Sequence, residues 1–330
     1  MIVSYTVNAR FWTCVVMGAA LVALALAGCT NPAGPAGPTT APGPYVYVAN
    51  NGTSGANGLS GFSIGSGGVL SAITSGTFTT GSGPWGIAIS PNGNYLYVAN
   101  GNSGGTNGLS GFTIGSDGSL SAITSGTFTT GSAPQRLAIS PNGNYLYVVN
   151  AVDSSVSAFT IGTGGALASI TGTFTTGTDP SDVAITPDGS YLYVTNYGSS
   201  GADGLSALSI GSDGALSPSG TYTTGSHPNG IAISPNGKYL YVTNHDNDDL
   251  SAFTIGSGGT LSAITGTFTT GSSPAGVAIS ADGNYLYVVN TAGTNGLSAF
   301  SIGSGGALSA ITTGTFTTGS TPWSLAITSR

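Results

Sequence analysis

The chain has 330 residues and a formal net charge of -7, with 5% charged residues, 39% hydrophobic residues and 56 glycines. Its few lysines and arginines exclude a phosphate-binding stripe, so nucleic-acid binding is not expected. A chain this poor in charge but rich in glycine, serine, threonine and asparagine is typical of an extracytoplasmic β protein.

Residues 1–29 have the pattern of an export signal. Arg10 precedes an apolar run from Val15 to Ala27, and the run ends in Leu26-Ala27-Gly28-Cys29. This ending resembles the lipobox of bacterial lipoproteins, which implies that Cys29 is lipidated after cleavage. A transmembrane anchor is the alternative, although the apolar run is short for spanning a bilayer. We therefore expect an exported, lipid-anchored protein at the outer membrane, in the periplasm or at the cell surface.

Residues 30–43 are rich in proline, glycine and threonine and cannot build a core. They are expected to form a tether, about 40 Å long if extended at ~3 Å per residue. A segment without a spacing role is the alternative. Cys14 and Cys29 are the only cysteines and both precede the tether, so no disulfide is expected in the rest of the chain.

A motif of the form Tyr-x-Tyr-Val-x-Asn recurs along the remaining chain at intervals of 46 to 50 residues. Its six copies begin at Tyr45, Tyr95, Tyr145, Tyr191, Tyr239 and Tyr285. Each unit holds four alternating apolar segments separated by turn residues. A period of this size fits a four-stranded propeller blade.

The second unit illustrates the predicted strands, which are Gly86–Ile89, Tyr95–Val98, Leu109–Ile114 and Leu120–Thr130. A Pro91-Asn92-Gly93 turn separates the first two strands, and no segment has a helical period. Large apolar residues recur at fixed phase in strands three and four, as Phe112 and Phe128 do here. We expect them to fill the space between neighbouring sheets.

The two ends of the repeat region predict how the ring closes. The unit that begins at Tyr45 lacks the Ile-Ala-Ile type of strand found before the other copies, while Leu325–Ile327 is a copy of that strand without a unit of its own. We therefore predict that residues 44–330 form an all-β propeller of six four-stranded blades, in which the C-terminal strand completes the N-terminal blade.

The stretch Ser90-Pro-Asn-Gly-Asn-Tyr-Leu-Tyr-Val-Ala-Asn100 resembles the repeat of the YVTN β-propellers. That repeat is shared with lactonase-type propellers such as the 6-phosphogluconolactonases, and the resemblance covers residues 44–330. It implies the propeller fold and, as an activity, lactone hydrolysis. Lactonase-type members generally have seven blades, whereas six repeats are counted here.

Differences among the units are confined to two connections, the one between strands two and three and the one entering strand one. In an up-and-down blade both lie on the same face, and the second delivers residues to the mouth of the central channel. Seven of the eleven acidic residues fall in these connections, namely Asp153, Asp179, Asp182, Asp203, Asp246, Asp248 and Asp249. The variable face is therefore expected to be acidic.

Candidate ligand-binding residues are those that differ at the entry to strand one. They are Trp85, Gln135, Arg136, Asp179, Asp182, His227, Asn229 and Trp323. The two tryptophans would form an aromatic platform for a sugar or peptide, or would simply cover the channel mouth. Arg136 would orient a carboxylate or a carbonyl, or would pair at the surface with Asp182 or Asp153.

His227 and His245 are candidates for acid–base chemistry, with Asp179 or Asp182 as orienting partners. Solvated loop histidines are the alternative. If the protein is an enzyme, the predicted catalytic set is His227, Arg136, His245 and Asp182.

The run from His245 to Asp249 is the densest polar cluster of the chain. Asp246, Asp248 and Asp249 are candidate calcium ligands, because calcium takes six or more oxygens. The spacing does not match an EF-hand loop, so a solvated turn is the alternative. No other cofactor is expected.

Two functional hypotheses follow. The first is a monomeric binding or structural module at the cell envelope, which would present its channel mouth to an extracellular glycan, peptide or envelope component and would touch the membrane only through the lipid anchor. The second is a hydrolase of an uncharged lactone at the same mouth, with His227 or His245 as the base and Arg136 polarising the carbonyl.

Overall fold

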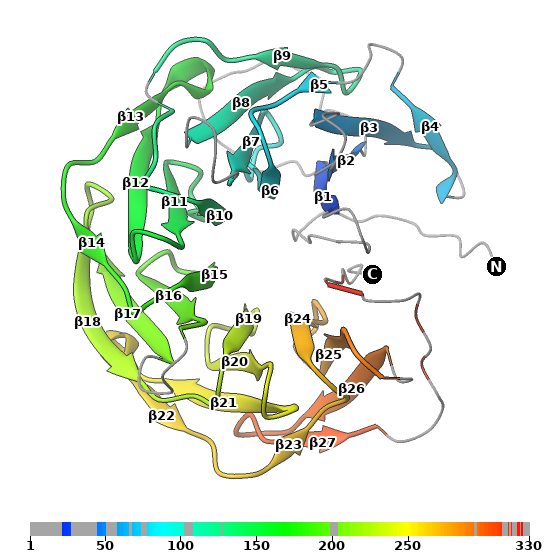
Figure 1. Cartoon of the computed structure of the whole chain (residues 1–330), viewed down its shortest axis with the longest axis vertical. Helices are drawn as coiled ribbons and strands as arrows, with labels where there is room; N and C mark the ends of the chain where they lie inside the picture. The colour runs from blue at the N-terminus through cyan, green and yellow to red at the C-terminus, as the bar shows by residue number, and fades with distance from the viewer. Residues whose placement is uncertain are drawn as a thin grey trace.

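The computed structural model describes residues 22–27, 45–50, 58–65, 68–73, 78–101, 108–126, 128–198, 204–293 and 296–311, together with residues 316, 318, 322, 323 and 325. Over these residues the protein is built from six antiparallel sheets arranged around a common centre (Figure 1). Two short 3-10 helices, η2 (Thr163–Gly165) and η3 (Ser257–Gly259), lie in turns. The predicted all-β propeller class is confirmed.

The bounds of the strands follow the repeat. The first sheet contains β1 (Val22–Ala27), β2 (Tyr45–Asn50), β3 (Gly58–Ile64), β4 (Leu70–Ala72) and β5 (Phe78–Thr79). The second contains β6 (Pro84–Ile89), β7 (Tyr95–Asn100), β8 (Gly108–Ile114) and β9 (Leu120–Ala122). The third contains β10 (Pro134–Ile139), β11 (Tyr145–Asn150), β12 (Ser155–Ile161), β13 (Leu167–Ser169) and β14 (Phe174–Thr175).

The remaining sheets have the same order. The fourth contains β15 (Pro180–Ile185), β16 (Tyr191–Asn196), β17 (Leu205–Ile210) and β18 (Leu216–Tyr222). The fifth contains β19 (Pro228–Ile233), β20 (Tyr239–Asn244), β21 (Asp249–Ile255), β22 (Leu261–Ala263) and β23 (Phe268–Thr269). The sixth contains β24 (Pro274–Ile279), β25 (Tyr285–Asn290), β26 (Leu297–Ile302) and β27 (Leu308–Ala310).

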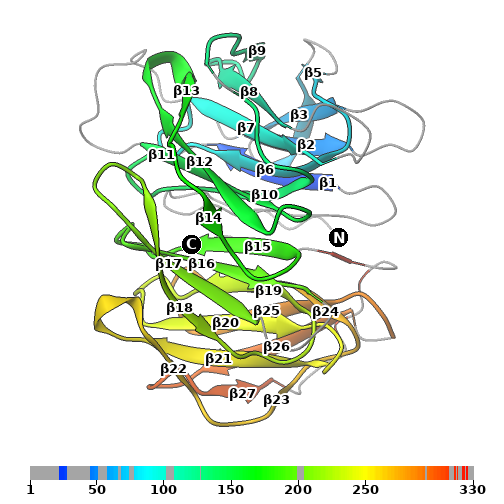
Figure 2. The same ribbon diagram turned by 60° about the vertical axis from the view of Figure 1, so that its left-hand side comes forward.

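Each sheet runs outward from the centre of the ring. The innermost strands β1, β6, β10, β15, β19 and β24 lie in this order around the centre, and consecutive ones pack side by side (Figure 1). The turned view in Figure 2 shows the sheets stacked face against face with a twist between neighbours. The outer strand is shorter than the predicted Leu120–Thr130, because the chain turns at Gly126, which has a positive φ of 112°.

A repeated hydrogen bond joins neighbouring sheets. The second tyrosine of each of the first five motifs is buried, and its hydroxyl donates to a glycine carbonyl in the turn after the third strand of the next sheet. The five bonds are Tyr47 to Gly118 (2.6 Å), Tyr97 to Gly165 (2.8 Å), Tyr147 to Gly214 (2.9 Å), Tyr193 to Gly259 (2.7 Å) and Tyr241 to Gly306 (2.7 Å). Five apolar cores lie at the same five junctions. The motif tyrosines therefore hold sheet to sheet.

The innermost strand of the first sheet differs from the prediction. It is β1, from within the predicted export signal, and not the C-terminal strand. Leu24 pairs with Val48 in the register in which Ile87 pairs with Val98 of the second sheet. The reason is that Leu24-Ala25-Leu26 has the same alternation as Leu325-Ala-Ile327, so both segments suit the edge of β2. Of the predicted C-terminal strand only Leu325 is among the described residues.

The junction between the sixth and first sheets is open in the described part of the chain (Figure 1). Tyr285 of the sixth sheet is 42% exposed, and Val69 of the first sheet is 59% exposed. Closure of the ring therefore stays a prediction, as do lipidation of Cys29 and the tether at 30–43, which lie outside the described residues. No helix among the described residues is long and apolar enough to cross a membrane.

Candidate functional site

In the second to sixth sheets the two variable connections meet at one edge. In the fifth sheet the first residue of β19, Pro228, pairs with the last residue of β20, Asn244. His227 and His245 therefore lie side by side, and the His245 N–H donates to the His227 carbonyl at 3.0 Å. The equivalent bonds run from Gly101 to Gly83, Ala151 to Ala133, Tyr197 to Asp179 and Thr291 to Ser273. The prediction that these connections share a face is confirmed for these sheets.

The asparagine of the motif locks this edge. Asn244 is buried, its Nδ2 donates to Ser251 Oγ at 3.0 Å, and its Oδ1 accepts from the Gly225 N–H at 3.0 Å. It thereby joins the third strand to the loop that enters the first strand. The residue before the proline takes a positive φ in the five connections that the structure describes, including 52° at His227 and 54° at Ala133. Because the conformation recurs, this strain belongs to the scaffold and is no sign of function by itself.

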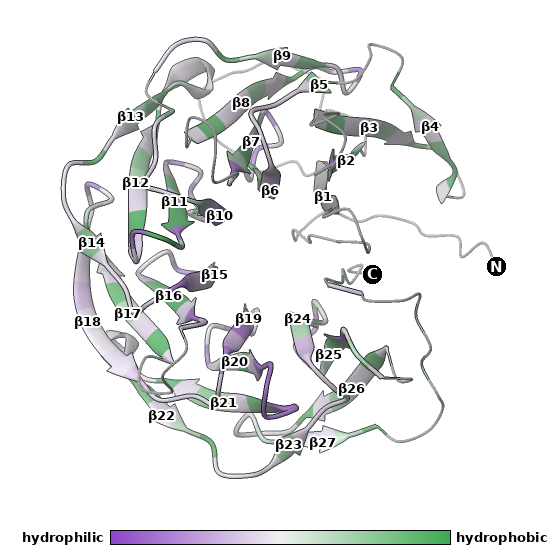
Figure 3. Cartoon of the chain, in the orientation of Figure 1, coloured by the Kyte–Doolittle hydropathy of each residue, from purple (hydrophilic) through white to green (hydrophobic). Residues whose placement is uncertain are grey.

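Asp246 lies between the two histidines. Its Oδ1 accepts a hydrogen bond from His245 Nδ1 at 2.8 Å, and its Oδ2 is 2.6 Å from His227 Nδ1. The second contact lacks hydrogen-bond alignment, and it is an ion pair only when His227 is protonated. The hydrogen bond from His245, with the nearby imidazole charges, lowers the pKa of Asp246. Figure 3 shows the loop between β20 and β21 as a hydrophilic segment at the rim of the fifth sheet.

The imidazoles remain accessible, since the His227 and His245 side chains are 27% and 22% exposed. Tyr197 of the fourth sheet packs against both. Its ring centroid lies 4.8 Å from that of His227 and 5.9 Å from that of His245. Sequence reasoning assigned neither Tyr197 nor the orienting role of Asp246, for which it named Asp179 or Asp182. The signal was available, because Tyr197 directly follows the motif asparagine, where other units have smaller residues.

The third sheet provides an internal comparison for this cluster. The Ala151 N–H donates to the Ala133 carbonyl at 3.0 Å, as His245 donates to His227. Val152, which is 73% exposed, takes the place of Asp246. The same backbone therefore forms without a single titratable group at these three positions. The His227, His245 and Asp246 side chains are additions to the scaffold and are not required by it.

Comparison with known proteins assigns the scaffold. Residues 104–260 and 254–330 match the model of the family described as Lactonase, 7-bladed beta-propeller. The chain belongs to this lactonase family. Six sheets are found among the described residues, whereas the family description gives seven blades. No curated protein matches the sequence.

Several solved structures resemble this lactonase-family chain. The periplasmic gluconolactonase PpgL of Pseudomonas aeruginosa has a TM-score of 0.71 at 18% identity, over 94% of this chain and 96% of that one. A protein from Lactobacillus plantarum has a TM-score of 0.71 at 20% identity, over 85% and 84%. A candidate 6-phosphogluconolactonase from Bacteroides uniformis has a TM-score of 0.65 at 21% identity, over 88% and 81%. At these identities the likeness shows the fold.

Asp182 lies in β15, between the third and fifth sheets of this lactonase-family ring. Its carboxylate accepts from the Val183 N–H at 2.9 Å and from the Ile231 N–H of neighbouring β19 at 3.3 Å. Burial raises the pKa of Asp182, and the positive charge of Arg136, followed by these two backbone donors, partly offsets that rise. The Asp182 carboxyl is therefore held at the packed interface between the fourth and fifth sheets.

Arg136 lies in β10 with Gln135, where both are partly buried and approach Gly86 of β6. Among the described residues Arg136 makes no ion pair within 4.0 Å, although a surface pair with Asp182 or Asp153 was expected. The charge of Arg136 instead acts on Asp182 at longer range. At Asp153 the carboxylate instead accepts from the Ser132 N–H at 2.7 Å.

The three candidate calcium ligands have separate partners. Asp246 binds the histidines, Asp248 accepts from the Ser273 N–H at 2.7 Å, and Asp249 accepts from Asn244 Nδ2 at 2.7 Å. The described residues contain no group of three or more acidic, histidine or cysteine side chains placed to hold a metal ion. The structure does not bring these three carboxylates together.

Trp85 and Asn229 are each the second residue of an inner strand, and Asp179 directly precedes one. Trp85 is partly buried in β6, Trp323 is 38% exposed, and no ring contact joins the two within the described residues. Asn229 lies in β19, and its carbonyl accepts from Thr195 Oγ1 of β16 at 2.7 Å. Asp179 precedes β15, and partial burial raises its pKa.

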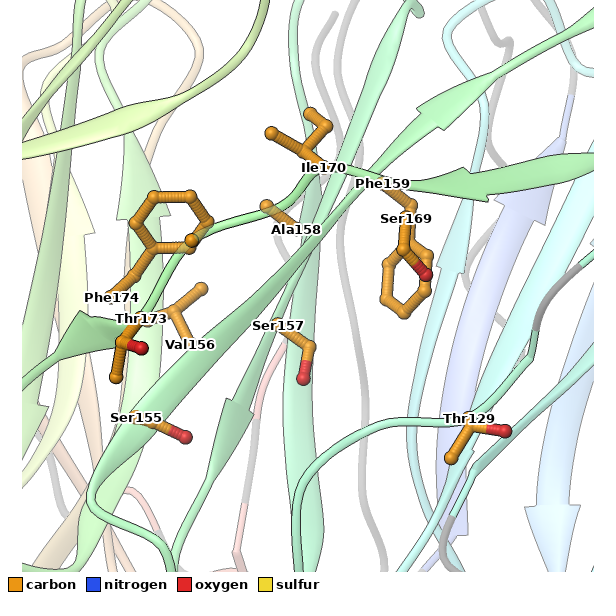
Figure 4. Close-up of a pocket in the computed structure, with 11 residues that line it drawn as sticks. Thr129, Ser155, Val156, Ser157, Ala158, Phe159, Ser169, Ile170, Thr173 and Phe174 are labelled. Atoms are coloured by element: carbon orange, nitrogen blue, oxygen red, sulfur yellow. The ribbon is translucent and has the colours of Figure 1, made fainter.

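A pocket of about 190 Å³ lies elsewhere, in the third sheet (Figure 4). Its walls include Ser157 and Phe159 of β12 and Phe174 of β14, and it opens where the outer strand is interrupted between β13 and β14. Phe159 and Phe174 are buried core residues, and none of the predicted site residues lines this pocket.

Proposed function

We propose that the protein hydrolyses an uncharged lactone at the rim of the fifth sheet, with His227, His245 and Asp246 activating the attacking water. The observation that carries the proposal is the single carboxylate between two accessible imidazoles. The lactonase family match and the likeness to a periplasmic gluconolactonase support it. They favour a hydrolase over the binding or structural module that was the first hypothesis from sequence.

The chemistry requires a base and later an acid. Because Asp246 faces the Nδ1 atoms, the Nε2 atoms are the positions at which the rings accept a proton. One imidazole takes a proton from water as the water oxygen bonds to the carbonyl carbon. The proton then passes to the ring oxygen as the carbon–oxygen bond breaks, which yields a hydroxy acid. The Asp246 carboxylate stabilises the imidazolium formed between these two steps.

The charge of the rim supports an uncharged substrate. Six of the seven aspartates in the variable connections are among the described residues, where Arg136 is the one arginine at this face. Such a surface repels a phosphorylated sugar lactone but not a neutral one. It also repels the carboxylate of the product and thereby favours its release.

Ring closure and export belong to the same proposal. We propose that the C-terminal strand Leu325–Ile327 replaces β1 beside β2 once the export signal is removed, and that the mature protein is lipid-anchored through Cys29. The shared register of β1 and the inner strands supports the replacement. The periplasmic gluconolactonase supports an envelope location.

The test is a pH-stat assay of the purified mature protein on neutral lactones, including δ-gluconolactone and γ-butyrolactone. The triple variant His227→Ala/His245→Ala/Asp246→Val reproduces the third sheet, so we expect it to fold normally and to lose activity. Loss of one acid–base group costs roughly 100- to 10,000-fold. A wild type that opens no lactone, or a folded triple variant with unchanged activity, contradicts the proposal.

A further inference from the structure

Tyr197 occupies a position that the scaffold does not require to be aromatic. Its backbone N–H donates to the Asp179 carbonyl at 2.8 Å. At the same place in four other sheets, the same bond is made by residues with other side chains, which are Gly101, Ala151, His245 and Thr291. The backbone geometry therefore places no demand on the side chain, and the phenol of Tyr197 needs another explanation.

The phenol ring reaches from the fourth sheet to the histidines of the fifth. The rings of Tyr197 and His227 are tilted by 49° with centroids 4.8 Å apart, and Tyr197 meets His245 edge-on at 5.9 Å and 64°. These distances are those of packed aromatic pairs. Tyr197 therefore limits the freedom of both imidazoles. A molecule that contacts the imidazoles lies close to Tyr197 as well.

The hydroxyl of Tyr197 has no hydrogen-bond partner among the described residues, unlike the buried tyrosines that join the sheets. Burial, followed by the negative charges of Asp246 and Asp179, raises its pKa. The phenol thus stays protonated at neutral pH and keeps a donor available to a ligand. An acceptor such as a carbonyl oxygen would satisfy it.

We propose that the Tyr197 hydroxyl donates a hydrogen bond to the carbonyl oxygen of the lactone while water activated by the histidine pair attacks the carbonyl carbon. This inference rests on the proposed function. A donor that stabilises the developing oxyanion must lie beside the base, and Tyr197 touches both imidazoles. Arg136, to which the sequence assigned this role, lies in the third sheet, where its charge acts on Asp182.

The test compares Tyr197→Phe, which keeps the ring and removes the hydroxyl, with Tyr197→Ala, which reproduces Ala151 of the third sheet. For Tyr197→Phe we expect kcat to fall roughly 100- to 1,000-fold, the cost of one oxyanion donor, with little change in KM. Tyr285→Phe is the matched control, because this exposed tyrosine belongs to the sixth sheet, and it should leave kcat unchanged.

Two further measurements separate the possible failures. The NMR chemical shifts of the imidazole protons should be nearly unchanged in Tyr197→Phe and altered in Tyr197→Ala, since only the second loses the ring that packs on both histidines. If Tyr197→Phe is folded and retains the wild-type kcat, the inference on Tyr197 is wrong while lactone hydrolysis stands. If the wild type opens no lactone, the proposed function is wrong. The hydroxyl contact is then tested by the binding of a neutral lactam. If the lactam binds the wild type no more tightly than it binds Tyr197→Phe, the hydroxyl contact is wrong as well.

Discussion

Replacement of Tyr147 by phenylalanine tests what holds the sheets together. Tyr147 is fully buried, and its hydroxyl donates to the buried Gly214 carbonyl of the next sheet at 2.9 Å. Tyr147→Phe keeps the ring but leaves that carbonyl without its donor, which costs about 1–3 kcal/mol. For a domain of this size, about 1 kcal/mol corresponds to roughly 2–4 °C in Tm. We therefore expect the Tm to fall by several degrees, measured by calorimetry or circular dichroism.

The same substitution at Tyr287 distinguishes an open ring from a closed one. Gly68 of the first sheet has a positive φ of 76°, like Gly214 at 80°, but no tyrosine hydroxyl of the described chain reaches it. If the mature ring closes, Tyr287 meets Gly68, and Tyr287→Phe lowers the Tm as much as Tyr147→Phe does. If the ring stays open, the effect is negligible.

Retention of residues 1–28 should abolish the Tyr287 effect but not the Tyr147 effect, because β1 then holds the edge of β2. A Tyr147→Phe variant within about 0.5 kcal/mol of the wild type, the range of neutral surface changes, would refute the role assigned to these hydrogen bonds.

Three further predictions concern the turns, the buried carboxyl and calcium. Gly164 and Gly165 both have positive φ, but only at Gly165 would a Cβ meet the ring of Tyr95, so Gly165→Ala should destabilise the protein by about 1–3 kcal/mol more than Gly164→Ala in urea unfolding; equal losses would contradict the packing argument. Because the pKa of Asp182 is raised in the folded state, the contribution of this carboxyl to stability is complete below its unfolded-state pKa and is lost as the pH rises through its folded-state pKa. The stability of Asp182→Asn relative to the wild type should therefore increase with pH. A difference independent of pH in urea titrations would argue against that raised pKa. Calcium at about 1 mM, the range of weak extracellular sites, should leave the Tm unchanged, because Asp246, Asp248 and Asp249 have separate protein partners. A rise in Tm that is reversed by chelation would instead support the calcium hypothesis.

The repeat made the fold predictable. Tyrosines and turn glycines recur in phase because each sheet must pack on the next, so the same contact recurs along the chain. Closure was less predictable, because Leu24-Ala25-Leu26 and Leu325-Ala-Ile327 have the same pattern and compete for one edge. Alternation specifies that a strand fits beside β2, but it does not specify which of two equivalent strands does so.

The positions of His227 and His245 on the variable face were predictable, but the residues that they contact were not. His227 and His245 were found because they interrupt otherwise uniform connections. Asp246 was assigned to calcium, because adjacent carboxylates in sequence suggest a shared ligand, whereas alternate side chains of the loop point to different partners. Tyr197 was missed because its contact crosses from one sheet to the next, and the sequence does not give the distance between neighbouring loops.

The contrast between the third and fifth sheets bears on how such a propeller acquires chemistry. Ala133 and Ala151 have the same backbone contact as His227 and His245, so histidines can be placed there without rebuilding the edge. The motif asparagine and the bonds it makes secure both connections, which leaves the adjacent side chains free to vary. The proposed reactivity then depends on residues of adjacent sheets, since Tyr197 of the fourth packs on both histidines of the fifth. If this reasoning is correct, transferring the three residues to the third sheet, as Ala133→His/Ala151→His/Val152→Asp, should give a folded protein. Its new histidines should lack the tyrosine contact that Tyr197 provides in the fifth sheet.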